Sequence, residues 1–376
     1  DLTGENIMSS PLAQLTDLGQ SIWYDFITRD LIQSGELARL IRDDSLRGMT
    51  SNPTIFEKAV ASSTDYDQDI RTLSEAGESP DGIVEALMIK DVKSACDVFR
   101  PVYDRVGHGD GTVSIEVSPK VANDTEGSIE AAHRLWRLVD RPNLMVKIPG
   151  TAAGLPAIAQ CLADGININI TLLFSVDRYR QVIDAFREGL ERRLALELPI
   201  NTIHSVASFF VSRVDGQCDP ELAKAGDRGK PLLHRMAIAN ARVAYEVFGQ
   251  SLLTPRWQAL AARGAHAQRP LWASTSTKDP SLPDVYYIEA LIAPDTVNTI
   301  PPDTLKAYAD HGKPEVRITP AAEIEAAANL AAYEKLGVSS LADRTAFLEE
   351  EGVRKFIDSW NQLVDRVKQK ASALAA

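Results

Sequence analysis

One lysine lies in a run of residues where a charge is unexpected. Residues 144–151 read LMVKIPGT, and this short apolar run predicts a buried β-strand that carries Lys147 near its end. An isolated ammonium is costly to bury, so a buried lysine pairs its charge or sheds its proton. Without that proton it is a nucleophilic amine that forms Schiff bases with carbonyl compounds. The alternative is a solvated lysine at the strand end, with its stem over apolar surface.

Two carboxyl groups stand at the ends of other predicted strands. Schiff-base chemistry needs proton transfers at several oxygens and one nitrogen, and a carboxyl group with a tuned pKa can carry them. Asp25 closes the first predicted strand and Glu116 lies late in the third, so these two are the candidates. The alternative for Asp25 is the N-cap of a helix over residues 26–42, and for Glu116 a solvated strand end.

Polar residues stand in or directly after seven successive predicted strands. In chain order they are Asp25, Asn52, Glu116, Lys147, Asn169 with Thr171, Ser208 and Ser274. Buried parallel strands should be almost continuously apolar, so packing alone does not predict this series. Asn169 and Thr171 are two residues apart and therefore face the same side of their strand. They form either part of a site with Lys147 or a hydrogen-bonded polar pair in the core.

Two cations follow the sixth and seventh predicted strands. Arg213 comes after the sixth strand and Lys278 after the seventh. Barrels of parallel strands often bind phosphate at the loops after their late strands. A phosphate site at this place would consist of Ser208, Arg213, Ser274 and Lys278. The alternative for Arg213 is an ordinary surface ion pair.

The elements that must position these residues alternate between strands and helices. Short runs rich in β-branched or aromatic residues predict eight strands, at residues 21–25, 47–51, 112–117, 144–149, 168–174, 206–211, 270–275 and 297–300. Helical patterns between them include residues 80–100, 126–139, 153–163, 176–196 and 231–248. This alternation predicts a (β/α)8 TIM barrel, whose strands all end at one mouth where active sites lie. A doubly wound open sheet is the alternative fold.

The tail after Pro302 predicts only helices, so residues 303–376 should be a helical extension packed on the barrel. Two long segments, 321–336 and 343–370, show helical periodicity. The second carries an apolar stripe that predicts packing rather than a cofactor site, made of Phe347, Phe356, Ile357, Trp360, Leu363 and Val367. No internal repeat or low-complexity linker interrupts the chain, so residues 1–376 are expected to form a single domain.

Composition restricts the partners. Forty basic against 52 acidic residues give a net charge of −12, which argues against nucleic-acid and anionic membrane partners. The three cysteines form no CxxC pair, no apolar run is long enough to span a bilayer, and no secretory signal is visible, so we expect a cytoplasmic protein. The six histidines show no HxxxH or HExxH spacing, and we expect neither a metal site nor a cofactor.

Six segments together resemble the motifs of class I transaldolases, in the longer form found in actinobacteria and cyanobacteria. The resemblance covers about residues 12–370, and the segments are GMTSNPTIF (48–56), SIEV (114–117), VKIP (146–149), ININITLLFS (166–175), HSVASFFVSRVD (204–215) and RPLWASTSTKD (269–279). It implies an enzyme of the pentose phosphate pathway that moves a dihydroxyacetone unit. The donor would be sedoheptulose 7-phosphate or fructose 6-phosphate, and the acceptor glyceraldehyde 3-phosphate or erythrose 4-phosphate.

The resemblance also implies a role for each candidate residue. Lys147 would form the Schiff base, Asp25 would take the proton of the C4 hydroxyl, and Glu116 would act through a water that Thr171 positions. Asn52 and Asn169 would hold the dihydroxyacetone moiety. The residues that would bind the substrate phosphate are Ser208, Arg213 and Ser274. Shorter bacterial members have an arginine soon after this last serine, whereas Lys278 stands here four residues on and would bind as a point charge.

Two other functions remain open from the sequence. A fructose 6-phosphate aldolase would release the three-carbon unit, but those relatives are much shorter and carry tyrosine where Phe210 lines the expected substrate site. A non-catalytic barrel that binds sugar phosphates is the alternative from another class. The expected assembly is a monomer or a homodimer. Some relatives are fused to a glucose 6-phosphate isomerase domain, so fusion to or association with another sugar-phosphate enzyme is a further expectation.

Overall fold

Eight parallel strands close into a barrel in chain order. The computed structural model describes residues 10–375. Each strand pairs with its neighbours in sequence, and β8 pairs with β1, so the sheet has no edge. The strands are β1 (Gln20–Asp25), β2 (Gly48–Thr50), β3 (Thr112–Glu116), β4 (Leu144–Pro149), β5 (Ile168–Leu173), β6 (Ser205–Phe210), β7 (Arg269–Ala273) and β8 (Thr296–Ile300). The TIM-barrel prediction is confirmed, the open-sheet alternative is wrong, and every strand lies close to its predicted bounds.

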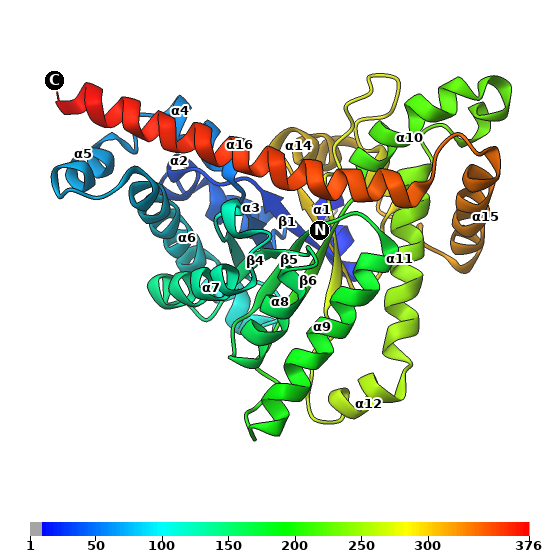
Figure 1. Ribbon diagram of the computed structural model, residues 1–376, viewed down its shortest axis with the longest axis horizontal. Helices are drawn as coiled ribbons and strands as arrows, with labels where there is room; N and C mark the ends of the chain where they lie inside the picture. Colours follow the sequence, from blue (N-terminus) through cyan, green and yellow to red (C-terminus); the bar gives the residue numbers. More distant parts are fainter. Residues whose placement is uncertain (1–9, 376) are drawn as a thin grey trace, which may run out of the picture.

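Helices follow the strands and cover the outside of the barrel (Figure 1). Half of the helices α1–α14 begin where a Ser, Thr, Asn or Asp side chain accepts a hydrogen bond from the first turn, as Ser79 does for α6 and Ser175 for α9. The helices before the tail are α1 (Pro11–Asp17), α2 (Arg29–Gln33), α3 (Glu36–Asp43), α4 (Pro53–Ser62), α5 (Asp67–Glu75), α6 (Pro80–Arg105), α7 (Thr125–Val139), α8 (Gly154–Ala163), α9 (Val176–Ala195), α10 (Ser212–Lys224), α11 (Met236–Leu252), α12 (Pro255–Ala261), α13 (Tyr286–Ala290) and α14 (Pro302–His311).

Three helix predictions are wrong in part. The helix expected over 26–42 is two helices, because Gly35 adopts a φ of 85° between α2 and α3. Thr28 caps α2, so the N-cap alternative for Asp25 is wrong. The helix expected over 231–248 begins only at Met236, after a short 3-10 turn that contains Pro231. The tail is not entirely helical, since residues 312–319 form an irregular segment.

The last helix crosses the molecule as a strap. After α15 (Pro320–Leu336), which packs on α11, the 35-residue α16 (Leu341–Ala375) runs from α15 to α5 (Figure 1). It packs against α4, α5, α6 and α10. Most of the predicted stripe packs inward as expected, but Phe347 is wrong: its side chain is 42% exposed. Gly352 of α16 lets the helix approach the barrel, because a β-carbon there would lie 3.1 Å from Leu172 Cδ2.

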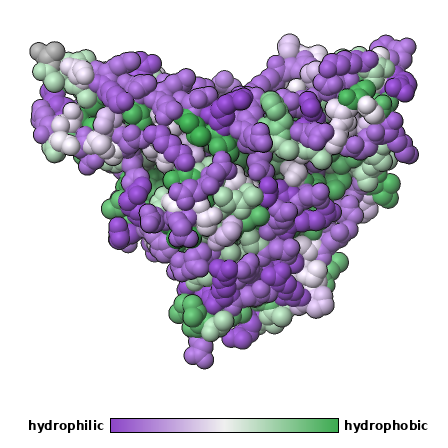
Figure 2. Space-filling view, viewed as in Figure 1, coloured by the Kyte–Doolittle hydropathy of each residue, from purple (hydrophilic) through white to green (hydrophobic). Residues whose placement is uncertain are grey.

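Hydrophilic residues dominate the face of the molecule seen in Figure 2, with smaller apolar patches between them. This agrees with the acidic composition and with an apolar core that lies around and inside the barrel. Among residues 10–375, no helix combines the length and the apolar character that crossing a membrane requires.

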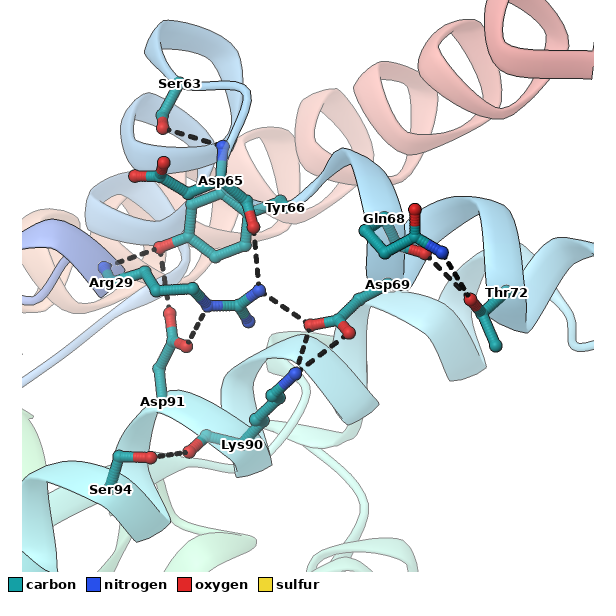
Figure 3. A network of polar contacts seen from close by, with 10 residues as sticks. All are labelled: Arg29, Ser63, Asp65, Tyr66, Gln68, Asp69, Thr72, Lys90, Asp91 and Ser94. Carbon is teal, nitrogen blue, oxygen red and sulfur yellow. Dashed lines mark hydrogen bonds and ion pairs between the residues drawn. The ribbon is translucent and has the colours of Figure 1, made fainter. Parts of the chain in front are cut away.

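A buried ionic network fixes the segment that leaves β1 (Figure 3). The Arg29 guanidinium donates to Asp91 Oδ1 at 2.9 Å and to Asp69 Oδ2 at 2.6 Å, and it lies over the ring of Tyr66. The Tyr66 hydroxyl donates to the other oxygen of Asp91 at 2.8 Å, and Lys90 pairs with Asp69 from α6. The network therefore ties the chain directly after the strand end at Asp25 to α5 and α6.

Breaking this network should destabilise the fold. Asp91→Ala leaves the Arg29 charge buried without its main partner, and we expect the free energy of unfolding to fall by about 3–5 kcal/mol. The measurement is urea unfolding followed by circular dichroism. Asp104→Ala, which removes the exposed pair with Arg100, is the control and should cost about 0–1 kcal/mol. Equal losses in the two variants would contradict the role given to the buried network.

Candidate active site

A cavity of about 400 Å³ opens at the carboxyl ends of the strands. A barrel of parallel strands brings these ends together, so side chains far apart in sequence meet there. Nine of the eleven candidates line it: Asp25, Asn52, Lys147, Thr171, Ser208, Phe210, Arg213, Ser274 and Lys278. Glu116 and Asn169 lie beneath its surface, as described below.

Lys147 is buried at the floor of the cavity with 4% exposure, so the solvated alternative is wrong. Its Nζ donates to the backbone oxygen of Ser51 at 3.0 Å and lies 3.4 Å from Oε2 of Glu116. Strand register explains this proximity, because Glu116 of β3 pairs directly with Lys147 of β4. The buried amine thus has a carboxyl group beside it on the neighbouring strand.

The Glu116 carboxyl group is fully buried and incompletely satisfied. Burial raises its pKa to about 7, while Lys147 acts in the opposite direction. Neither oxygen of Glu116 has a hydrogen-bond partner in the structure, and the same holds for Oγ1 of Thr171. Buried polar atoms are nearly always hydrogen-bonded, so unpartnered oxygens around one amine indicate a place for a polar ligand or water. The solvated alternative for Glu116 is wrong.

Asp25 lies at the end of β1, in register with Thr50 of β2. The Thr50 hydroxyl donates to Asp25 Oδ1 at 2.8 Å and therefore accepts from the Thr299 hydroxyl, 2.5 Å away. Burial raises the pKa of Asp25, and Lys147, the Thr50 hydrogen bond and Arg213 oppose that effect. A carboxyl group with one oxygen fixed by a threonine keeps the other available for proton transfer.

The fifth strand separates its two candidates. Asn169 is fully buried, with its Nδ2 donating to Ser114 Oγ at 3.0 Å and its Oδ1 accepting from Ser208 Oγ at 2.6 Å. It matches the polar-core alternative and does not line the cavity. Its assignment to substrate binding stays a prediction. After Ile170 the pairing of β5 with β6 becomes irregular, and Leu172 there adopts a φ of 59°. Thr171 belongs to this irregular segment, and its side chain lines the cavity.

Arg213 and Lys278 bring positive charge to one wall of the cavity. Arg213 lies over the Phe210 ring at 5.4 Å, and its buried Nη1 has no hydrogen-bond partner in the structure. Burial lowers the pKa of Arg213 and also of Lys278. Neither cation forms an ion pair within residues 10–375, so the surface-pair alternative for Arg213 is wrong. Ser274 Oγ lies 2.9 Å from Ser212 Oγ beside them. This wall is suited to an anion.

Asn52 has two functions at the mouth. Its amide oxygen accepts from the backbone N–H of Ile55 at 3.0 Å and so caps α4. Capping occupies only the oxygen of the side chain, and the residue also lines the cavity. The amide nitrogen is therefore the group of Asn52 that a bound molecule can use.

Sequence reasoning missed several residues of the site. They are Ser51 and Thr50, which hydrogen-bond to Lys147 and Asp25, Thr299, which hydrogen-bonds to Thr50, and two further lining residues, Lys58 and Phe356. Ser51 acts through its backbone oxygen, which no residue type reveals. Lys58 lies in the second turn of α4, where an exposed lysine is ordinary, so its residue type gives no signal of a site. Phe356 is recognisable as part of the apolar stripe, but the stripe does not indicate that it walls the cavity.

The family comparison agrees with this geometry. The family model described as transaldolase/fructose-6-phosphate aldolase matches residues 22–367, which includes all eleven candidates. A protein named transaldolase from Parafrankia sp. (strain EAN1pec) is 51% identical over 371 residues, covering 98% of this chain and 100% of the relative. Transaldolases from Acidothermus cellulolyticus and Thermobifida fusca are 52% and 49% identical over 96% and 97% of this chain, and 96% and 100% of their own lengths. The chain therefore belongs to the transaldolase/fructose-6-phosphate aldolase family.

Proposed function

We propose that this chain is a transaldolase, a transferase that moves a dihydroxyacetone unit between sugar phosphates through a Schiff base on Lys147. The observation that carries the proposal is the buried Lys147 amine, 3.4 Å from a carboxyl group and inside a cavity with a cationic wall. The donor is a ketose phosphate of six or seven carbons, fructose 6-phosphate or sedoheptulose 7-phosphate. The acceptor is erythrose 4-phosphate or glyceraldehyde 3-phosphate.

Imine formation uses the Lys147 and Glu116 pair. The neutral amine attacks the C2 carbonyl of the donor, and the new hydroxyl leaves as water when it receives a proton. Glu116 supplies that proton through a bridging water, because a carboxyl group with a pKa raised to about 7 carries a proton over much of the neutral range. The unpartnered oxygens of Glu116 and Thr171 support a water at this place.

Cleavage of the donor uses Asp25. Its carboxylate takes the proton of the C4 hydroxyl, the C3–C4 bond breaks, and its electron pair moves into the iminium to form an enamine. The aldose product leaves with its phosphate, and the bound enamine attacks the aldehyde of the acceptor. Asp25 then returns its proton to the new hydroxyl, and water releases the product ketose by hydrolysis of the imine.

The cavity also supports the binding roles. Arg213, Ser274 and Lys278 are suited to the phosphate, and the Asn52 amide to the hydroxyls of the three-carbon unit. Ser208 lines the cavity, but its hydroxyl donates to Asn169, so these two act as a pair that shapes the floor. The described cysteines are free thiols, which suits a cytoplasmic enzyme of the pentose phosphate pathway.

The aldolase alternative is not favoured. The similar relatives are named transaldolase and match this chain over nearly their full length, whereas fructose 6-phosphate aldolases are expected to be much shorter. Phe210 places an apolar ring against Arg213 and Phe174, without a hydroxyl that could hold a hydrolytic water. The enamine should therefore persist until an acceptor arrives.

Borohydride reduction in the presence of fructose 6-phosphate should label Lys147, as read by peptide mapping. Lys147→Ala should lose the label and lower kcat/KM by more than about a thousandfold. Asp25→Asn is the matched control: it should still be labelled at Lys147 while turnover falls by about 10²–10⁴. A label on another residue, or full activity of Lys147→Ala, would contradict the mechanism and favour a non-catalytic barrel.

The contribution of Glu116 to activity should fall on the alkaline side as this group loses its proton. Because burial raises the pKa of Glu116 to about 7, the proton-donating form is present below that pH and disappears above it. We expect the ratio of kcat/KM for fructose 6-phosphate between the native chain and Glu116→Gln to decline through pH 7, by about tenfold per unit, because this ratio cancels the pH dependence that other groups give to both proteins. A ratio that stays constant across pH 7 would contradict the role of Glu116 as proton donor.

Free dihydroxyacetone should not accumulate. With fructose 6-phosphate alone, the three-carbon unit should stay on Lys147, so one equivalent of glyceraldehyde 3-phosphate appears per site and the reaction then stops. Adding erythrose 4-phosphate should restart it. The measurement is a coupled assay for both three-carbon products. Release of dihydroxyacetone in step with substrate loss would instead indicate the aldolase.

A further inference from the structure

A third cation lines the catalytic cavity without an assigned role. Lys58 of α4 reaches the cavity that contains Lys147, and it lies close enough to Lys278 for their charges to repel. Lys58 forms no ion pair or hydrogen bond within residues 10–375, and Arg213 and Lys278 form no ion pair there either. Three cations without a carboxylate partner at one mouth are notable in a chain of net charge −12.

The three cations come from two sides of the barrel. Arg213 is the second residue of α10, which follows β6, and Lys278 lies in the loop after the neighbouring strand β7. Lys58 belongs to α4, which follows β2, and β2 is four strands away from β6 around the closed barrel. Lys58 therefore approaches an anion bound by Arg213 and Lys278 from across the cavity.

Nearby carboxylates do not neutralise this group. Glu351 of α16 acts on the charges of both Arg213 and Lys278, but its carboxylate pairs with Lys355 at 3.2 Å. The carboxyl group of Asp25 offsets only part of the positive charge, by its electrostatic attraction to Arg213. An anionic ligand of about two negative charges, such as a phosphate monoester near pH 7, matches the remaining charge.

We propose that Lys58 is a further specificity-determining residue, which contacts the substrate phosphate from the side of the mouth opposite Arg213. This inference rests on the proposed function. Arg213 fixes the phosphate with a rigid guanidinium, whereas Lys58 and Lys278 provide ammoniums on flexible stems. Flexible cations can follow a phosphate whose distance from the Schiff base differs by one carbon between six- and seven-carbon donors. Lys58 thus selects phosphorylated sugars and serves both donor lengths.

The test compares phosphorylated and unphosphorylated ligands in Lys58→Gln. The KM for fructose 6-phosphate and for sedoheptulose 7-phosphate should each rise about tenfold, with kcat little changed, because one charge-assisted contact is lost. Borohydride trapping of dihydroxyacetone on Lys147 should proceed as in the native chain, since this compound carries no phosphate. Lys58→Arg keeps the charge and should restore most of the affinity.

The matched control is Lys335→Gln, an exposed helical lysine of α15 that lines no cavity described here and should change nothing. Unchanged KM values in Lys58→Gln would overturn the proposal. Equal losses for the phosphates and for dihydroxyacetone trapping would also overturn it, because they would indicate a structural role for Lys58.

A direct binding measurement separates this proposal from the proposed reaction. Inorganic phosphate should bind the native chain and bind Lys58→Gln about tenfold more weakly in calorimetry, whether or not the chain forms a Schiff base. If phosphate binding follows this pattern while Lys147 is never labelled, the reaction is wrong and the phosphate contact stands. Normal labelling of Lys147 with equal phosphate binding by both proteins would leave the reaction intact and reject the contact.

Discussion

The site depends on one contact between a buried amine and a buried carboxyl group. Lys147 and Glu116 face each other across neighbouring strands, and burying the two charges costs more than their attraction commonly returns. The pair persists because the barrel fixes both backbones and the Ser51 carbonyl gives the amine a hydrogen bond. The same burial raises the pKa of Glu116 toward neutrality. An arrangement whose burial costs free energy thus places a nucleophile and a proton donor in contact.

Much of the barrel could be predicted because its strands are buried on both faces. Such strands are short apolar runs, and a polar residue at the end of one stands out. Lys147, Asp25 and Glu116 were identifiable for this reason, and the closed sheet brings them together. The motif resemblance supplied their separate roles, which residue types alone did not distinguish.

What sequence reasoning missed depends on contacts between distant segments. Asn169 is two residues from Thr171, yet its hydrogen bonds to Ser114 and Ser208 take it below the cavity. Phe347 fits the periodicity of its stripe but lies where α16 has no element to cover it on that side. The Ser51 carbonyl and Lys58 could not be predicted from residue type. Every residue has a backbone oxygen, and many exposed helices carry a lysine, so only their positions in the folded chain mark these two groups.

The strap helix α16 makes one wall of the active site depend on a segment that lies far along the chain from the other lining residues. All eight strands and all eleven candidate residues precede it in the chain, whereas Phe356, which closes one wall of the cavity, lies within α16. A chain cut before α16 would therefore keep the reactive amine and every candidate residue, but its cavity would be open on the side that Phe356 closes.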